Sequence, residues 1–304
     1  MPEATSTAVG PGRTMPMGSP ARLNLEGNDQ RWLFRGASLE IVSWRCLAID
    51  QQLTPERHMP WNEVTFAHAG SFRLHAGDRT HLIDGASVAL LNAGIPFRTS
   101  HPVGCGDVGS SIVVCPDLLR SLIADEGRER LAFHEVSVPC CSRLLLRQRQ
   151  LVRALRRGLP IEPLQIEEEA LAIVGKLLGS GSNPVAGRRP GRHISREAAA
   201  TAEAAREYIA SRYTDRLRLR EIAAACEVPV FRLCRAFLAA TSMTVHRYAM
   251  RLRLVAALER LASGERDLTA LALDLGFSSH SHFSWAFRRE FDLSPSAWRC
   301  LGER

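Results

Sequence analysis

Two stretches near the C-terminus repeat one another, and this duplication constrains the fold more than any other feature of the chain. Leu219–Ala223 (LREIA) aligns with Leu268–Ala272 (LTALA) 49 positions later, and Phe237 aligns with Phe287 50 positions later. The offset grows by one residue because the second copy carries one extra residue. Self-similarity at such a period indicates two copies of one supersecondary unit.

The second copy has the pattern of a helix-turn-helix. Apolar residues recur at helical spacing through Leu268–Leu275, and Gly276 breaks the run where a tight turn needs a positive φ. Ser279 can cap a new helix, in which Phe283 and Phe287 mark a buried face. A short helix, a turn with glycine and a second helix with a polar outer side predict a helix-turn-helix.

A longer helix is predicted between the two copies. Val245–Leu261 continues a helical pattern that includes Arg247, Arg251 and Arg253. At 1.5 Å per residue this helix is roughly 25 Å long. Two recognition helices joined by it could enter successive major grooves, about 34 Å apart on one face of DNA. The net charge of +7 is compatible with such a polyanionic partner.

The outward residues of the two recognition helices are the predicted DNA contacts. They are Phe231, Arg232, Arg235, Ser279, His280, Ser281, Ser284, Trp285, Arg288 and Arg289. In the first helix, Leu233, Ala236 and Phe237 are predicted to be buried, so Arg232 and Arg235 either reach guanine edges and phosphates or form a solvated face.

In the second helix, two alternatives stay open for Trp285. Its ring either contacts a thymine methyl group or a sugar, or it packs on the helix at 245–261. Arg288 and Arg289 are expected to contact phosphates more than bases.

The N-terminal part has a different period. Short alternating segments lie between Trp32 and Cys115, separated by turn signals such as Asp84-Gly85, and they predict an antiparallel sandwich or barrel. The predicted strands are Leu39–Ile49, Glu63–Ala69, Ser71–His75, His81–Ile83, Ser87–Leu91, Phe97–Thr99 and Ser110–Cys115. A double-stranded β-helix, or cupin-like roll, encloses a ligand-sized cavity, so small-molecule sensing is the expected use.

No catalytic or metal-binding motif is recognisable in this N-terminal part. A metal cupin needs two histidines one residue apart on a strand, and no such pair occurs among His58, His68, His75, His81 and His101. We therefore predict no enzyme activity, no metal and no cofactor. Arg98 and His101 follow a turn and either face a bound anion or mark a strand end with surface charges.

After Pro116 the period changes to that of helices. A short helix is predicted at Asp117–Ile123, followed by a hairpin of Ser142–Leu159 and Leu164–Leu178. The apolar stripe of this hairpin either packs onto the barrel or forms the seam of a homodimer.

Composition divides the chain into four parts. Residues 1–22 are predicted to be a disordered tail, 23–178 a sensing and dimerisation domain, 179–194 a flexible linker and 195–304 a DNA-binding domain. The predicted fold class is α+β multidomain: an N-terminal antiparallel β-barrel with a helical hairpin, then an all-α double helix-turn-helix.

Eight cysteines are present, and none forms a C-x-x-C pair. Because no secretory signal or membrane span is recognisable, we expect reduced thiols, a cytoplasmic location and no membrane association. A redox switch is the alternative for the thiols.

The last hundred or so residues resemble the AraC/XylS family of bacterial transcription regulators. The resemblance lies in the second repeat, A-L-D-L-G-F-S-S-H-S-H-F-S-W-A-F-R-R-E-F-D-L-S-P-S-A-W. The segments L-L-N-A-G-I-P-F-R-T-S-H-P and A-L-R-R-G are similar to the cupin-type sensing domain of one branch of that family. The resemblance implies a promoter-binding regulator, often an activator, with double-stranded DNA, RNA polymerase, a small-molecule effector and a second copy of the chain as partners.

The chain departs from the family pattern at several turns. Glu227, Pro229 and Val230 replace the usual glycine, serine and proline of the first repeat. Ser242 and Asp292 stand where glycine is usual. The base preferences of relatives are therefore not transferred to this chain.

Two other functions remain open at this point. The chain could be a cupin-type small-molecule-binding or metal-dependent enzyme with a DNA-binding tail, and stoichiometric metal would favour that hypothesis. It could also be a DNA-binding protein without an effector, in which the barrel only dimerises the chain.

Overall fold

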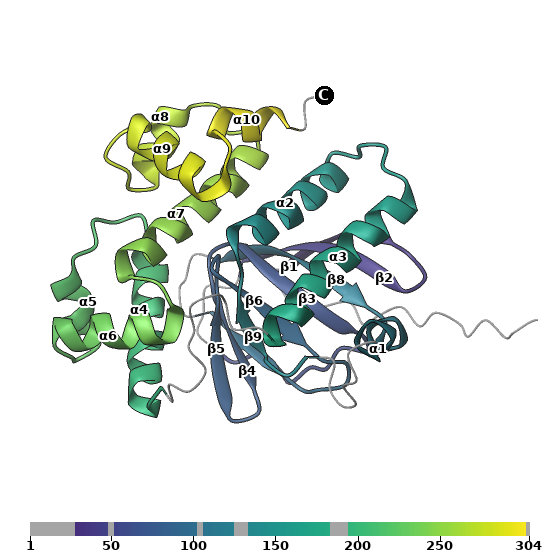
Figure 1. The fold of residues 1–304 in the computed structure, drawn as a ribbon, viewed down its shortest axis with the longest axis horizontal. Coiled ribbons are helices and arrows are strands. Elements are labelled where there is room, and N and C mark those ends of the chain that lie inside the picture. Colours follow the sequence, from purple (N-terminus) through teal and green to yellow (C-terminus); the bar gives the residue numbers. More distant parts are fainter. Residues whose placement is uncertain (1–27, 48–51, 102–105, 125–132, 183–193, 302–304) are drawn as a thin grey trace, which may run out of the picture.

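The computed structural model describes residues 28–47, 52–101, 106–124, 133–182 and 194–301. Two antiparallel sheets and a group of helices form the N-terminal domain, and the C-terminal domain is helical (Figure 1). This arrangement confirms the predicted α+β fold class. The predicted tail at 1–22 lies outside the described residues.

The N-terminal domain contains a larger sheet of strand order β1-β2-β8-β3-β6-β9 and a smaller one of order β5-β4-β7. The strands are β1 (Asn28–Arg35), β2 (Leu39–Cys46), β3 (Asn62–Ala69), β4 (Phe72–Ala76), β5 (Arg79–Ile83), β6 (Ser87–Leu91), β7 (Arg98–Ser100), β8 (Asp107–Val114) and β9 (Ser137–Pro139). The paired strands among the described residues are antiparallel, and Ile41, Val64 and Ile112 of three adjacent strands are almost fully buried.

The sequence patterns did not reveal β1 and β9. β1 begins with four polar residues, so its alternation is weak, and β9 is only three residues long and ends in a proline. Both strands lie at the edges of the larger sheet, where short and polar strands are tolerated.

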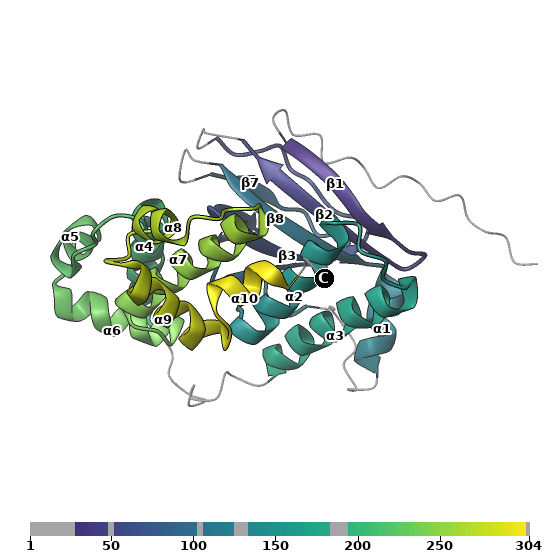
Figure 2. The same cartoon turned by 90° about the horizontal axis from the view of Figure 1, so that it is seen from above.

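The helical hairpin covers one face of the larger sheet (Figures 1 and 2). It consists of α2 (Ser142–Arg156) and α3 (Pro163–Ser182), and a separate short helix, α1 (Pro116–Ala124), precedes it. Val152 and Ile173 are buried in the same core as the sheet residues, so the apolar stripe packs within the chain. The alternative of a homodimer seam stays a prediction.

The hairpin also changes one predicted boundary. α3 continues to Ser182, four residues into the predicted linker at 179–194, and α4 begins at Arg196 with Ser195 as its N-cap. The remainder of the predicted linker, 183–193, lies outside the described residues.

The C-terminal domain contains two helix-turn-helix units joined by a long helix. The first unit is α5 (Leu219–Ala225) and α6 (Val230–Thr241), and the second is α8 (Leu268–Asp274) and α9 (His280–Phe291). α7 (Val245–Ala262) joins them, α4 (Arg196–Arg212) packs on α6, and α10 (Pro295–Cys300) closes the chain. In Figure 1 the two units lie at opposite ends of α7, as the repeat predicts.

Two arginines of α7, Arg251 and Arg253, form hydrogen bonds with neighbouring segments of the chain. Arg251 is 6% exposed and donates hydrogen bonds to Ser142 Oγ, to Glu290 and to the carbonyl oxygen of Cys140. Arg253 donates to the carbonyl oxygens of Tyr213, Asp215 and Gly276. Both side chains therefore fix neighbouring segments on α7.

Three residues that depart from the family pattern adopt the backbone conformation that favours glycine. Glu227, Ser242 and Asp292 have φ angles of 54°, 57° and 59°. Ser242 and Asp292 are the C-caps of α6 and α9, where a left-handed residue ends the helix. These turns thus adopt the geometry that favours glycine although other residues occupy them.

Candidate DNA-binding surface

The first recognition helix, α6, presents an arginine and an aromatic ring to solvent. Leu233, Ala236 and Phe237 are buried as predicted, while Phe231 is 72% exposed. The Arg235 guanidinium lies 5.5 Å from the centroid of the Phe231 ring, and both side chains border a hollow between α4 and α6. This stacking holds the arginine along the exposed face of the helix.

Arg232 of the same helix is exposed but has a partner. Its Nη2 lies 2.5 Å from Oε1 of Glu197 on α4, with about half of each side chain exposed. Such an exposed pair contributes little to stability. Arg232 would have to leave Glu197 before it contacted a phosphate or a base.

The second recognition helix, α9, repeats this combination. Phe283, Ala286 and Phe287 are buried, and Trp285 is 59% exposed. Arg289 lies with its guanidinium carbon 5.1 Å from the Trp285 ring. Of the two alternatives for Trp285, packing on α7 is wrong, because the ring is on the outer side.

The polar residues at the start of α9 are partly occupied by the helix itself. Ser279 is the N-cap, and its hydroxyl oxygen accepts a hydrogen bond from the backbone nitrogen of His282 at 3.1 Å. Ser284 Oγ lies 3.3 Å from Nε2 of His280. Ser281, His280 and Arg288 are exposed.

The helical pattern of the sequence did not single out His282, which lies in the first turn of α9. Its ring lies 3.1 Å from Ser278 Oγ and packs edge-on against Phe277. The side chain is half-buried, so it supports the turn before the recognition helix.

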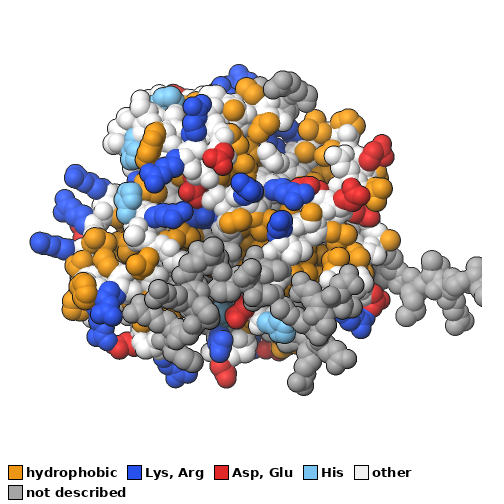
Figure 3. All heavy atoms as spheres, viewed as in Figure 1, with side chains coloured by type: hydrophobic (Ala, Val, Ile, Leu, Met, Phe, Trp, Pro, Cys, Tyr) orange, Lys and Arg blue, Asp and Glu red, His pale blue; other side chains and the backbone are white. Residues whose placement is uncertain are grey.

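The exposed residues of α6 and α9 form a surface suited to a polyanion. Each helix carries an exposed aromatic ring with an arginine four residues later, and arginine and histidine side chains gather over this end of the molecule (Figure 3). Arginine binds phosphate oxygens and guanine edges, whereas flat rings suit sugars and thymine methyl groups. The surface therefore has the chemistry of a DNA-binding face.

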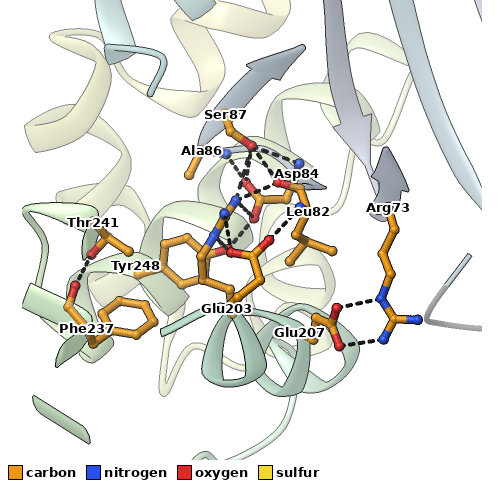
Figure 4. A network of polar contacts seen from close by, with 11 residues as sticks. Arg73, Leu82, Asp84, Ala86, Ser87, Glu203, Glu207, Phe237, Thr241 and Tyr248 are labelled. Carbon is orange, nitrogen blue, oxygen red and sulfur yellow. Dashed lines mark hydrogen bonds and ion pairs between the residues drawn. The ribbon is translucent and has the colours of Figure 1, made fainter. Parts of the chain in front are cut away.

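A buried polar network connects α4 and α7, which lie beside the first helix-turn-helix, to the sheet domain (Figure 4). Asp84, which is fully buried after β5, accepts a 2.9 Å hydrogen bond from Arg206 of α4 and another from the hydroxyl of Tyr248 on α7. Burial lowers the pKa of Arg206, but the charges of Asp84, Tyr248 and Glu203 together outweigh it and raise that pKa. Beside this cluster, Arg73 of β4 forms a bidentate pair with Glu207 of α4.

A second network connects α7 to the larger sheet and to α2. Glu259 of α7 accepts hydrogen bonds from Arg149 and Arg156, each at 2.7 Å, and from Nδ1 of His68 at 3.0 Å. His68 is 0% exposed, and burial lowers its pKa to about 3. Burial opposes ionisation of Glu259, but the His68 hydrogen bond and the two arginines outweigh it and hold that pKa well below its usual range.

We expect this second network to weaken in acid. The folded-state pKa values of His68 and Glu259 both lie below their unfolded values, so the unfolded chain binds more protons as the pH falls below about 6.5. The stabilisation is complete above that pH and is lost progressively below it. In His68→Gln, the free energy of unfolding should fall less between pH 7 and pH 5 than in the unaltered chain, as urea titrations would measure.

The exposed His58 provides the matched control for this prediction. His58→Gln should keep the pH dependence of the unaltered chain. An identical pH dependence in His68→Gln and the unaltered chain would show that His68 does not titrate in this way.

The sheet domain also contains a cavity of about 80 Å³. The lining residues are Gln30, Trp44, Cys46, Arg57, Glu63, Thr65, Phe72, Leu74, Ala89, Leu91, Phe97, Thr99, His101 and Asp107. Of the two predicted effector contacts, His101 lines this cavity and Arg98 does not. Arg98 is exposed, and its guanidinium lies 3.7 Å from the carboxylate of Glu56. Arg57 could not be singled out from sequence, because the segment around it has no regular hydrophobic period.

The histidines and cysteines differ in their surroundings. His75 lies 2.9 Å from Ser100 Oγ and His68 has Glu259, as expected of satisfied side chains, but His101 approaches Cys46 and Asp107. The sequence did not predict this cluster, because its members are distant in the chain. The described cysteines are free; Cys46 and Cys140 are buried, and Cys141 and Cys300 are exposed.

Comparison with known proteins identifies the helical part of the chain. Residues 222–300 match a family described as "Helix-turn-helix domain". The HTH-type transcriptional activator RhaS of Yersinia pestis (strain Pestoides F) is 34% identical over 89 residues, which cover 29% of this chain and 33% of that protein. RhaS of Citrobacter koseri is 46% identical over 55 residues, or 18% of this chain and 20% of that protein.

Two solved structures are similar at a lower level. ToxT from Vibrio cholerae O395 is 15% identical with a TM-score of 0.37, covering 88% of this chain and 98% of its own. An AraC-type regulator structure from Chromobacterium violaceum is 25% identical with a TM-score of 0.33, covering 34% and 93%.

The two helix-turn-helix units and their exposed faces define a tandem DNA-binding domain. Residues 222–300 match this helix-turn-helix family, and the C-terminal region is similar to the RhaS activators. The chain spans about a third of the length of the curated relatives it matches. Among the described helices, none has the length and apolar character needed to cross a membrane.

Proposed function

We propose that the protein is a sequence-specific transcription regulator that binds double-stranded promoter DNA through α6 and α9. One observation carries the proposal. In a tandem helix-turn-helix domain, both recognition helices present an arginine stacked on an exposed aromatic ring. Exposed rings of this size are costly in water, and contact with sugars and thymine methyl groups removes that cost.

Within this surface we assign different roles to the side chains. Arg235 and Trp285 contact bases or sugars, because they lie on the exposed faces of their helices. Arg288 and Arg289 contact phosphates from the last turn of α9. Arg232 also contacts a phosphate once its ion pair with Glu197 is broken.

We further propose that the sheet domain is a cupin-like roll whose cavity binds a small-molecule effector. The lining of the cavity supports this proposal, because it combines apolar walls with a few polar groups, as is usual for ligand sites. The sheet domain and α2 contact the helices beside the two units, through Asp84 and Arg206 of α4 next to the first and through Arg153 and the carbonyl oxygen of Arg299 in α10 next to the second. A change at the cavity would thus alter the spacing of the two recognition helices.

The remaining partners follow from the family resemblance. We propose that the protein acts in the cytoplasm as a homodimer and that it activates transcription with RNA polymerase. The matching relatives are described as transcriptional activators, which supports this choice.

Arg235→Ala and Trp285→Ala should each weaken binding to the target DNA by roughly 1–3 kcal/mol if the side chains contact bases. The affinity of the purified full-length protein can be measured by fluorescence anisotropy at a fixed salt concentration. For Arg288→Ala, which removes a phosphate contact, affinity should fall evenly across DNA sequences and the salt dependence should become shallower.

Two exposed residues far from this surface provide matched controls. Arg120 of α1 and Leu164 of α3 are exposed, and Arg120→Ala and Leu164→Ala should leave DNA affinity unchanged. If Arg235→Ala and Trp285→Ala bind like these controls, the recognition helices do not read DNA through these side chains.

A further inference from the structure

Three reactive side chains meet at one wall of the cavity in the sheet domain. Sγ of Cys46 lies 3.4 Å from Nε2 of His101, and Nδ1 of His101 lies 2.9 Å from Oδ1 of Asp107. Each of the three is at least 95% buried. Cys46 ends β2 and Asp107 begins β8, and the two are paired in the antiparallel register of these strands. The sheet therefore holds the thiol and the carboxylate side by side, with the imidazole between them.

A thiol, an imidazole and a carboxylate in this order form an activated nucleophile. The imidazole takes the thiol proton, and the carboxylate orients the ring and stabilises its cation. The hydrogen bond with Asp107, followed by that with Cys46, raises the pKa of His101 to about 10. The reactive form of a cysteine is the thiolate, and an imidazole within hydrogen-bond distance of the sulfur can take the thiol proton.

The same three residues could be considered as metal ligands, because their donor atoms lie within 4.8 Å of one another. The geometry favours the other chemistry. Each ring nitrogen of His101 faces a different neighbour, so a metal at Nε2 would have Cys46 and His101 as ligands and leave Asp107 on the far side of the ring. Two protein ligands are fewer than zinc sites use.

The other residues that line the cavity indicate which kind of molecule could bind beside the thiol of Cys46. Trp44, Phe72 and Leu91 supply apolar walls. Arg57 supplies a cation that interacts with the charges of Glu63 and Cys46, and its buried Nε has no hydrogen-bond partner among the described residues. A cavity of about 80 Å³ admits a small molecule with an apolar skeleton and an oxygen for the arginine.

We propose that the effector is a small α,β-unsaturated carbonyl compound and that Cys46 captures it by conjugate addition. The sulfur forms a bond to the β-carbon, and the electron pair of the C=C bond moves to the carbonyl oxygen as an enolate. The proton on Nε2 of His101 then passes to the α-carbon, which leaves a neutral imidazole beside Asp107. Nothing is oxidised or reduced. The effector role rests on the proposed function, whereas the chemistry of Cys46 does not.

Competition among the thiols of one molecule tests the chemistry. The full-length protein is treated with cyclohex-2-enone, and the modification of Cys46 is compared by mass spectrometry with that of the exposed Cys141 and Cys300. At pH 7, Cys46 should react at least ten-fold faster, because His101 lies within hydrogen-bond distance of its sulfur and can take its proton. His101→Gln should remove this advantage.

The unaltered chain makes the test independent of the stability of that variant, because the thiols compete within one folded molecule. The charged groups that line the cavity with the thiol are His101, Asp107, Arg57 and Glu63. The rate of modification at Cys46 should exceed the rates at Cys141 and Cys300. A Cys46 rate equal to theirs, or a bound metal ion that blocks alkylation of Cys46, would overturn the proposal.

The effector role is tested by DNA affinity before and after treatment. Adduct formation at Cys46 should change the affinity at least five-fold, and Cys46→Ser should abolish this change whereas Cys141→Ser should not. A selective adduct that leaves DNA affinity unchanged overturns the effector assignment. A protein that binds no DNA even when untreated overturns the proposed function instead, and the two failures are thus distinct.

Discussion

Arg206→Ala is expected to lower the free energy of unfolding by about 3–5 kcal/mol, because it leaves the carboxylate of Asp84 buried without its cation. Asp84 has no exposed surface, and its remaining partners are the Tyr248 hydroxyl, the Ala86 backbone nitrogen and the Ser87 hydroxyl. These groups donate hydrogen bonds but carry no positive charge. Urea denaturation followed by tryptophan fluorescence and circular dichroism would measure the loss.

A double-mutant cycle separates the ion pair from its surroundings. Asp84→Asn removes the buried charge, so Asp84→Asn with Arg206→Ala should lose less stability than the sum of the two single changes. Arg196→Ala, at an exposed position on the same helix, should change the stability by less than about 0.5 kcal/mol. A loss below about 1 kcal/mol in Arg206→Ala would mean that the pair does not hold the first helix-turn-helix to the sheet.

Gly276→Ala is expected to destabilise the second helix-turn-helix by about 2–5 kcal/mol. The φ angle of Gly276 is 76°, which costs an L-residue about 1–2 kcal/mol. A Cβ at this position would also lie 2.2 Å from the carbonyl oxygen of Thr214, a backbone atom that cannot rotate away. Forcing that contact adds about 1–3 kcal/mol. Loss of helix by circular dichroism on urea titration would give the magnitude.

Gly77 is the matched control for the steric part. It has a φ angle of 56°, and an added Cβ there would meet nothing within 4 Å. Gly77→Ala should therefore lose only the backbone contribution, about 1–2 kcal/mol. Equal losses at Gly77 and Gly276 would show that the turn moves away from Thr214 without cost.

The tandem helix-turn-helix could be predicted because its signals are local. Repeat spacing located both units, and the helical period separated buried Phe237 and Phe287 from exposed Arg235 and Trp285. The same period could not show that Ser279 uses its hydroxyl as a cap or that Arg232 pairs with Glu197. Those contacts depend on how α4 and the turn are placed in space.

The networks between the domains could not be predicted from a pattern. Asp84 and Tyr248 are 164 residues apart, and His68 and Glu259 are 191 residues apart. The hydrophobic pattern of each segment does not indicate which distant residue it contacts. A buried polar residue also interrupts the alternation of polar and apolar residues on which such predictions rest. The Cys46, His101 and Asp107 cluster was missed for the same reason, and the expected pairing of Arg98 with His101 was drawn from closeness in sequence alone.

Selection of double-stranded DNA from a random pool by the purified full-length protein tests the central claim most directly. The proposed function predicts an enriched motif with two blocks centred about one helical turn, roughly 10 base pairs, apart. The Arg235→Ala, Trp285→Ala double variant should lose preference in at least one block. A pool that shows no enriched motif after selection with the unaltered chain would contradict the account.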